Sequence, residues 1–273
     1  MRTLRSALFM PASNARAIEK ARGLACDAVI LDLEDAVAPE AKASARIQAM
    51  QAAADGGFGT RTLALRINAL DSEWGIADCE AARDAGFDAI VLPKVSHPDD
   101  LSAARALLGD VPLWAMIETC AAMLALPAIA ATRGLGCLIA GTNDLAKDMR
   151  CTPGADRLPL LPHLTAIVTA ARAHGLIALD GVSNVLAETP ELAAECAQGA
   201  AFGFDGKTLI HPAQIALANR AFAPSAERVA WAEAVIAAFA QPENADKGAI
   251  RVQGEMVERL HLSEAERIVA LAR

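Results

Sequence analysis

The feature that most constrains this chain is an alternation of short apolar runs with longer alanine-rich stretches dotted with charge, repeated eight times. Each apolar run has the length of a buried β-strand, and the longer stretches have helical periodicity. Repeated strand–helix units predict a parallel sheet covered by helices. The expected strands are Ala7–Met10, Ala28–Leu33, Thr62–Ile67, Ala89–Leu92, Leu113–Ile117, Cys137–Ala140, Ile177–Leu179 and Phe204–Ile210.

The helical stretches carry their own start and stop signals. Four of them begin at a proline, which the first helical turn tolerates, and several end at a glycine. The expected helices include Asn14–Gly23, Pro39–Ala54, Asp71–Ala85, Pro98–Leu108, Leu160–His174, Pro190–Gln198 and Pro212–Ala221.

Eight strand–helix units in a chain of 273 residues favour an α/β fold closed into a (β/α)8 TIM barrel. An open doubly wound sheet shows the same alternation. Such a sheet usually carries a glycine-rich turn after its first strand, and Phe9-Met-Pro-Ala-Ser-Asn-Ala has none. We therefore expect a barrel catalytic domain over residues 1–222.

The last part of the chain, residues 223–273, departs from this rhythm. A helix is expected at Ser225–Ala240, followed by a polar stretch and then by Arg251–Glu258. The final helix is expected to start at Ser263, as N-cap, with Glu266 three residues later. The pattern predicts a C-terminal helical arm, which we expect to pack on a neighbouring subunit.

Composition narrows the classes of partner. A net charge of −8 and the lack of a basic run argue against nucleic acid. No uncharged apolar segment reaches the about 18 residues that a membrane span needs. Six scattered cysteines without a C-x-x-C motif are typical of reduced thiols. We expect a cytoplasmic protein.

Polar residues gather where the expected strands end. In a parallel barrel all carboxyl ends open on one face, which is where active sites lie. Arg66 is the most informative, because an arginine inside an apolar strand needs a buried anion. The residues at this face are Asp32, Glu34, Asp35, Arg66, Asn68, Lys94, Glu118, Asn143, Asp144, Asp180, Lys207 and His211.

Carboxylates without matching His or Cys favour a hard cation, and magnesium before zinc. Magnesium often takes only one or two protein carboxylates and leaves places for substrate oxygens. Glu118 could instead be an isolated salt-bridge partner. His211, at a strand end, could line the site or lie outside it.

Several motifs in order resemble the citrate lyase beta-subunit-like family, which contains malyl-CoA and citramalyl-CoA lyases within the wider group of HpcH/HpaI-type aldolases. The resemblance runs from residue 5 to about residue 258. The motifs are Arg5-Ser-Ala-Leu-Phe-Met-Pro-Ala, Leu31-Asp-Leu-Glu-Asp-Ala-Val, Leu65-Arg-Ile-Asn, Leu92-Pro-Lys-Val, Ile117-Glu-Thr, Gly141-Thr-Asn-Asp-Leu and Gly203-Phe-Asp-Gly-Lys-Thr-Leu-Ile-His-Pro-Ala-Gln-Ile.

The resemblance implies a homotrimer or hexamer and assigns roles to individual residues. Glu118 and Asp144 would hold Mg²⁺, with Glu118 also facing the substrate. Arg66 would bind the oxygen that becomes the enolate, or the adjacent carboxylate. Asp35, with Glu34, would order water at the metal and act as a catalytic residue.

Coenzyme A would cross the barrel mouth, with Arg5, Arg16 and Lys20 as candidate phosphate contacts. Lys94 is expected to have a structural role or to lie beside the substrate.

The implied reaction is cleavage of a 3-hydroxy-3-carboxy-acyl-CoA of the malyl-CoA or citramalyl-CoA type. A metal lowers the hydroxyl pKa, and retro-Claisen cleavage releases a 2-oxo acid and an acyl-CoA. Arg66 and the metal would offset the developing charge. The chain is thus expected to be a magnesium-dependent carbon–carbon lyase that acts on a CoA thioester.

Two alternatives remain. The chain could be the citryl-cleaving beta subunit of a citrate lyase complex, or a catalytically idle barrel that binds CoA thioesters or serves in assembly. The family commonly has Gly-x-Met-Ile/Val-Asp-x-Pro near its C-terminus, whereas this chain has Glu258 and Leu260 at the Asp and Pro positions. That departure puts thioester hydrolysis and condensation in more doubt than lyase chemistry.

Overall fold

The computed structural model describes residues 4–244 and 246–272. The chain forms two compact units, Met1–Phe222 and Ala223–Arg273.

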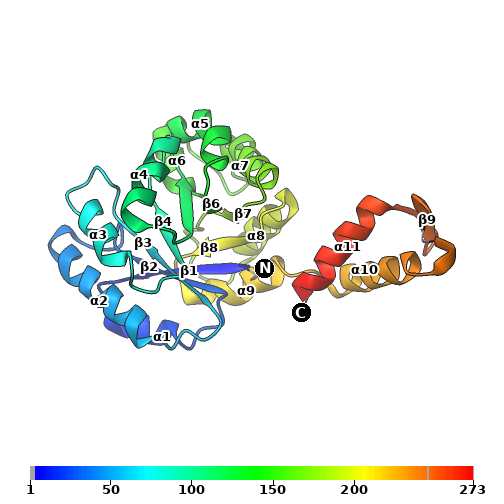
Figure 1. Ribbon diagram of the computed structural model, residues 1–273, viewed down its shortest axis with the longest axis horizontal. Coiled ribbons are helices and arrows are strands. Elements are labelled where there is room, and N and C mark those ends of the chain that lie inside the picture. Colours follow the sequence, from blue (N-terminus) through cyan, green and yellow to red (C-terminus); the bar gives the residue numbers. More distant parts are fainter. Residues whose placement is uncertain (1–3, 245, 273) are drawn as a thin grey trace. The chain divides into compact units, whose positions relative to one another are not determined.

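The first unit is a closed barrel of eight parallel strands in sequence order, with β1 also paired to β8 (Figure 1). The predicted (β/α)8 fold is confirmed. The strands are β1 (Ser6–Pro11), β2 (Ala28–Asp32), β3 (Thr62–Arg66), β4 (Ala89–Leu92), β5 (Leu113–Ile117), β6 (Leu135–Ala140), β7 (Ile177–Asp180) and β8 (Gly206–Leu209).

Helices follow the strands and surround the barrel (Figure 1). Several are capped at their first turn: the Thr119 and Thr189 hydroxyls accept hydrogen bonds from the first turns of α5 and α8. The helices are α1 (Ala15–Ala21), η1 (Pro39–Ala41), α2 (Lys42–Asp55), α3 (Gly75–Ala82), α4 (Pro98–Leu108), α5 (Cys120–Ala130), α6 (Thr142–Asp148), η2 (Leu158–Leu160), α7 (Leu161–Ala173), α8 (Pro190–Phe202), η3 (Pro212–Gln214) and α9 (Ile215–Ala221).

The barrel strands bury both of their faces. Alternate residues point inward, and their cluster mixes alanines with larger side chains such as Phe9, Trp114 and Met116. The remaining strand residues pack outward against the helices in a separate, larger cluster. Because both faces are apolar, the strands read as continuous apolar runs in the sequence.

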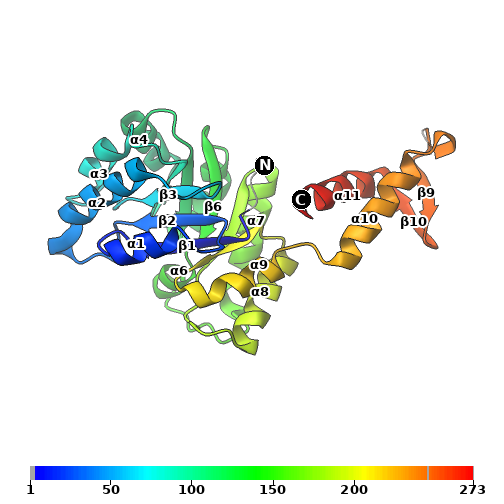
Figure 2. The same ribbon diagram turned by 90° about the horizontal axis from the view of Figure 1, so that it is seen from below.

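The described part of the second unit contains two longer helices and a hairpin (Figure 2). Its elements are α10 (Ala226–Phe239), η4 (Pro242–Asn244), β9 (Ala249–Val252), β10 (Glu255–Glu258) and α11 (Arg259–Ala272). The hairpin is antiparallel, and buried residues of all four longer elements share one apolar cluster.

The start expected for the last helix was wrong. α11 begins at Arg259, so Ser263 lies inside the helix. The His261 Nδ1 accepts a hydrogen bond from the Glu258 backbone N–H at 2.9 Å, next to the start of the helix. The hairpin turn lies at Gln253 and Gly254, both with positive φ, and β10 ends at Glu258, directly before the helix.

No helix among residues 4–244 and 246–272 is long and apolar enough to cross a membrane. Packing of the arm on a neighbouring subunit, and a trimeric or hexameric assembly, stay predictions.

Candidate active site

The parallel strands bring the carboxyl-end residues to one end of the barrel. Asp32 is the last residue of β2 and Arg66 the last residue of β3. Glu118 directly follows β5, and Asp144 lies in the first turn of α6, just after β6. We call Asp32, Glu34, Asp35, Arg66, Lys94, Glu118 and Asp144 the acidic cluster.

Glu118 is 1% exposed, and its two carboxylate oxygens differ. Oε1 accepts a hydrogen bond from the Lys94 backbone N–H at 2.7 Å, whereas Oε2 is buried without a hydrogen-bond partner. Burial raises the pKa of Glu118 to about 7; the charges of Glu34 and Asp144 add to the rise, and the Lys94 N–H and Arg66 oppose it. A cation beside Oε2 would relieve this cost.

Gly141 lets the end of β6 approach this carboxylate. A Cβ at position 141 would lie 2.4 Å from Glu118 Oε2, so a side chain would displace Glu118. Asp144 follows on the same turn of chain and is close enough for its charge to act on Glu118.

Among residues 4–244 and 246–272, no group of three or more His, Cys, Asp and Glu side chains is placed to hold a metal. A cation at Glu118 and Asp144 would therefore complete its coordination with water or substrate oxygens, as magnesium does in proteins.

Arg66 is buried and held on two sides. Its Nε and Nη2 donate to the two carboxylate oxygens of Asp32, both at 2.7 Å, and the guanidinium carbon lies 4.6 Å from the Phe9 ring centroid. Burial acts to lower the pKa of Arg66, but Asp32, Glu34 and Asp35 together raise it. The anion that the sequence predicted for this arginine is thus Asp32.

The third nitrogen of Arg66 faces the other acids. Nη1 lies 3.0 Å from Glu34 Oε2 and 3.8 Å from Asp35 Oδ2. Glu34 is buried, which raises its pKa against the lowering effect of Arg66 and Lys94. The Asp35 side chain is 61% exposed, so it can exchange protons with solvent.

Lys94 contacts two other members of the cluster, which fits the structural one of the two roles expected for it. Its ammonium group pairs with Glu34, and its backbone, in the left-handed region at φ 53°, directs its N–H to Glu118. A non-glycine residue in this conformation is held there by its surroundings.

Sequence reasoning missed the helix residues that support this face. Lys42, on α2, is buried and donates to the backbone oxygens of Leu33 and Glu34 at 2.8 and 2.7 Å. Asp78, on α3, accepts from both the backbone and the side chain of Asn68. Residues on helices do not follow a strand end, so the pattern of polar strand ends cannot identify them. A charged residue among the alanines of α2 is only a weak sign of such a role.

Not all the residues expected at this face meet there. Arg5 precedes β1 and is paired with Asp27 at 2.8 Å, at the amino end of the strands, so it cannot contact a ligand at the carboxyl ends. Arg16 and Lys20 are exposed on α1. His211 is exposed and caps η3 by accepting from the Ala213 N–H, a structural role that needs no ligand.

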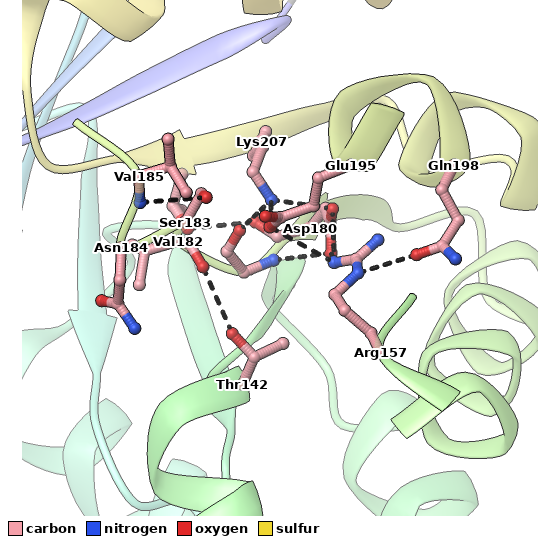
Figure 3. Close-up of polar contacts among 12 residues, drawn as sticks. Thr142, Arg157, Asp180, Val182, Ser183, Asn184, Val185, Glu195, Gln198 and Lys207 are labelled. Carbon is pink, nitrogen blue, oxygen red and sulfur yellow. Dashed lines mark hydrogen bonds and ion pairs between the residues drawn. The ribbon is translucent and has the colours of Figure 1, made fainter. Parts of the chain in front are cut away.

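Asp180 and Lys207 belong to a second charged group, with Arg157 and Glu195, that we call the balanced network (Figure 3). Lys207 is fully buried and donates to Asp180 Oδ2 at 3.0 Å and to Glu195 Oε1 at 2.7 Å. Arg157 Nη1 donates to Asp180 at 2.8 Å. A cavity of about 240 Å³ lies beside it, lined in part by Arg157 and Glu195.

Fold and site together define a (β/α)8 barrel enzyme with a carboxylate-rich site at the carboxyl ends of its strands. Residues 5–212 match the family model described as HpcH/HpaI aldolase/citrate lyase, and the chain belongs to this family. The resemblance drawn from the motifs is confirmed.

Individual relatives are similar over almost the whole chain. A (3S)-malyl-CoA thioesterase of Cereibacter sphaeroides is 47% identical over 98% of this chain and 94% of its own length. The mitochondrial citramalyl-CoA lyase of Rattus norvegicus is 31% identical over 98% of this chain and 86% of its own length.

Among solved structures, CitE from Mycobacterium tuberculosis in complex with magnesium, acetoacetate and coenzyme A has a TM-score of 0.82. It is 30% identical and covers 100% of this chain and 99% of its own. The family thus includes both lyases and thioesterases named for CoA thioesters.

Proposed function

We propose that this chain is a magnesium-dependent enzyme that acts on a 3-hydroxy-3-carboxy-acyl-CoA of the malyl-CoA or citramalyl-CoA type, and that it breaks the carbon–carbon bond. The observation that carries the proposal is the buried, unpartnered Oε2 of Glu118, next to the charge of Asp144. The CoA thioesters named for the relatives, and the magnesium and CoA bound in CitE, support the same choice.

The residues present fit a magnesium ion. Glu118 and Asp144 offer carboxylate oxygens, which a hard cation prefers. An orphaned buried carboxylate oxygen is costly unless a ligand completes it. We therefore assign Glu118 and Asp144 as the metal ligands, with Glu118 also contacting the substrate.

Magnesium bound there supplies Lewis-acid polarisation of the hydroxyl and carboxylate oxygens that the substrate presents. In the reaction the substrate hydroxyl loses its proton, and the bond between its carbon and the carbon next to the thioester breaks. The electron pair of that bond forms the thioester enolate, which then takes up a proton. The products are a 2-oxo acid and an acyl-CoA, with no net oxidation.

The chain's own residues act on charge and protons. Arg66 keeps its full positive charge because Asp32 holds it in place, and its Nη1 side offsets negative charge on the enolate or the adjacent carboxylate. Asp35, exposed and 3.8 Å from Arg66, is the carboxylate that we assign to proton transfer and water ordering. Glu34 fixes Arg66 and Lys94 relative to each other.

Thioester hydrolysis is the second candidate, because the relative that is 47% identical is named a (3S)-malyl-CoA thioesterase. Both reactions act on the same hydroxy-acyl thioester, but hydrolysis breaks the carbon–sulfur bond and consumes water. Glu258, which stands where the family commonly has Asp, lies at the end of β10 in the second unit.

The test is product analysis with malyl-CoA, citramalyl-CoA, methylmalyl-CoA and citryl-CoA in the presence of magnesium. Release of a 2-oxo acid together with an acyl-CoA is the expected result. Free CoA and a hydroxy acid, without any 2-oxo acid, would establish hydrolysis instead. Cleavage of citryl thioesters alone would favour the citrate lyase subunit, and no turnover on any member would favour the idle barrel.

A further inference from the structure

Arg157 is an unusual residue in the loop between α6 and α7. Its backbone is left-handed, at φ 55°, and its side chain is only 7% exposed. Nη1 donates to both carboxylate oxygens of Asp180, at 2.8 and 2.9 Å, and Nε donates to Gln198 at 2.8 Å (Figure 3). These contacts hold the strained backbone of Arg157 in place and keep its guanidinium against the end of β7.

The end of β7 is in turn pressed against the end of β6. Asp180 Oδ1 accepts a hydrogen bond from the Gly181 N–H at 2.9 Å. A Cβ at Gly181 would lie 2.6 Å from the Ala140 carbonyl oxygen and 2.5 Å from Thr142 Oγ1. The Asp180–Gly181 turn therefore cannot move toward β6 without displacing the end of β6.

The end of β6 is pressed against Glu118 in the same way. A Cβ at Gly141 would lie 2.3 Å from Glu118 Cβ. The Leu145 N–H donates to the Gly141 carbonyl at 3.0 Å, so the turn of α6 that carries Asp144 is anchored at Gly141. Two glycine contacts in series thus connect the balanced network to both proposed metal ligands.

We propose that Arg157 is a positioning residue for the metal site: by holding Asp180, it fixes the end of β7 against the end of β6, and so sets the spacing of Glu118 and Asp144. This inference rests on the proposed function. Arg157 acts through packed backbone and contacts neither the metal nor the substrate.

Because Lys207 also pairs with Asp180, the effect of Arg157 on position can be measured apart from its effect on charge. Without Arg157, Asp180 keeps the Lys207 ammonium at 3.0 Å, so its buried charge stays paired. Asp180 then loses the contacts that hold it from the side of the α6–α7 loop. Removing Arg157 thus keeps part of the charge pairing of Asp180 but leaves the end of β7 free to move.

The test is Mg²⁺ affinity by titration calorimetry, without substrate, for the wild type and Arg157→Met. We expect about tenfold weaker binding, as for outer partners that orient metal ligands. Arg172→Met is the matched control, because Arg172 pairs with Asp205 at 2.9 Å just before β8, at the amino end of the barrel. That variant is expected to keep the wild-type affinity.

A folded Arg157→Met protein with wild-type Mg²⁺ affinity would overturn the inference. Arg157→Lys should restore part of the affinity, because a lysine can reach Asp180 with one ammonium but cannot also bind Gln198. If Arg157→Met does not fold, Gln198→Ala decides. It removes the acceptor of Arg157 Nε and the hydrogen bond from Gln198 to the Asp156 carbonyl, but it leaves the contact of Arg157 with Asp180 in place. It should weaken Mg²⁺ binding by less than the about tenfold expected for Arg157→Met, and unchanged affinity contradicts the inference.

Glu118→Gln, titrated alongside, separates this inference from the proposed function. Wild-type Mg²⁺ affinity in Glu118→Gln would disprove the metal site itself. Loss of affinity in Glu118→Gln, but not in the Arg157 variants, would disprove only the positioning role.

Discussion

The two charged groups at the carboxyl ends of the strands differ in their balance of positive and negative charge. The acidic cluster sets five carboxylates against Arg66 and Lys94. It leaves the buried Oε2 of Glu118 without a hydrogen-bond partner, whereas Glu34 Oε2 has an ion-pair contact with Arg66 at 3.0 Å. The balanced network pairs Asp180 and Glu195 with Arg157 and Lys207, and only Arg157 Nη2 lacks a partner.

The difference distinguishes a site that binds a ligand from a charged group that maintains a fixed geometry. Unpaired buried charge lowers stability, so it persists where an incoming ligand completes it. Paired buried charge fixes geometry, because moving either partner uncovers the other. On this comparison the acidic cluster is the place for a cation and the balanced network is its support.

The largest expected effect is on activity when the acidic cluster loses its metal ligand. Glu118→Gln removes a charged oxygen and should lower magnesium-dependent turnover by at least about a thousandfold, equivalent to about 4 kcal/mol. The measurement is 2-oxo acid release under saturating magnesium.

Metal removal should have the same effect on the wild type. A chelator should stop turnover, and added magnesium should restore it. Turnover that resists the chelator, or full activity in Glu118→Gln, would contradict the metal assignment.

Loss of a cation from the balanced network should mainly lower the free energy of unfolding. Lys207→Met leaves buried Asp180 with one cation fewer and is expected to cost about 3–5 kcal/mol of unfolding free energy, or roughly 10 °C in melting temperature. Thermal denaturation of the metal-free protein measures it.

Glu118→Gln is the contrasting variant in that experiment. It removes a carboxylate whose pKa burial has raised, so the cost of keeping it ionised at neutral pH disappears. The metal-free variant should be at least as stable as the wild type. Equal destabilisation by Glu118→Gln and Lys207→Met would end the distinction between the two groups.

The smallest expected effect contrasts the two ends of the barrel. Arg16, exposed on α1, is the candidate for a CoA phosphate, and Arg16→Ala should raise the KM of a CoA thioester a fewfold, since an exposed ion pair is worth up to about 1 kcal/mol. Arg5→Ala should leave KM unchanged, because Arg5 is paired with Asp27 at the amino end. Steady-state kinetics compares them, and an equal rise in both would argue against this placement.

The sequence alone determined the barrel and most of its strands. Ala89–Leu92 and Leu113–Ile117 were predicted with the bounds they have, because strands buried on both faces stand out as apolar runs between polar ends. Phe204–Ile210 was drawn too long. Phe204 is buried and apolar, but it follows the glycine that ends α8, and β8 starts only at Gly206.

The sequence also determined which residues to consider for chemistry, since strand order places Arg66, Glu118 and Asp144 at one end of the barrel. It did not determine their partners. That Asp32 holds Arg66, and that Lys94 binds Glu118 through its backbone, depends on the pairing of neighbouring strands and on one left-handed residue.

Only the tertiary structure revealed Arg157, Lys42 and Asp78. They lie in a loop and on helices, where a charged residue is ordinarily exposed. Their roles come from contacts across 23, 9 and 10 residues of sequence, to Asp180, Leu33 and Asn68. A local pattern can predict which strand ends carry polar groups, but packing between distant segments decides which of those groups are left for a ligand.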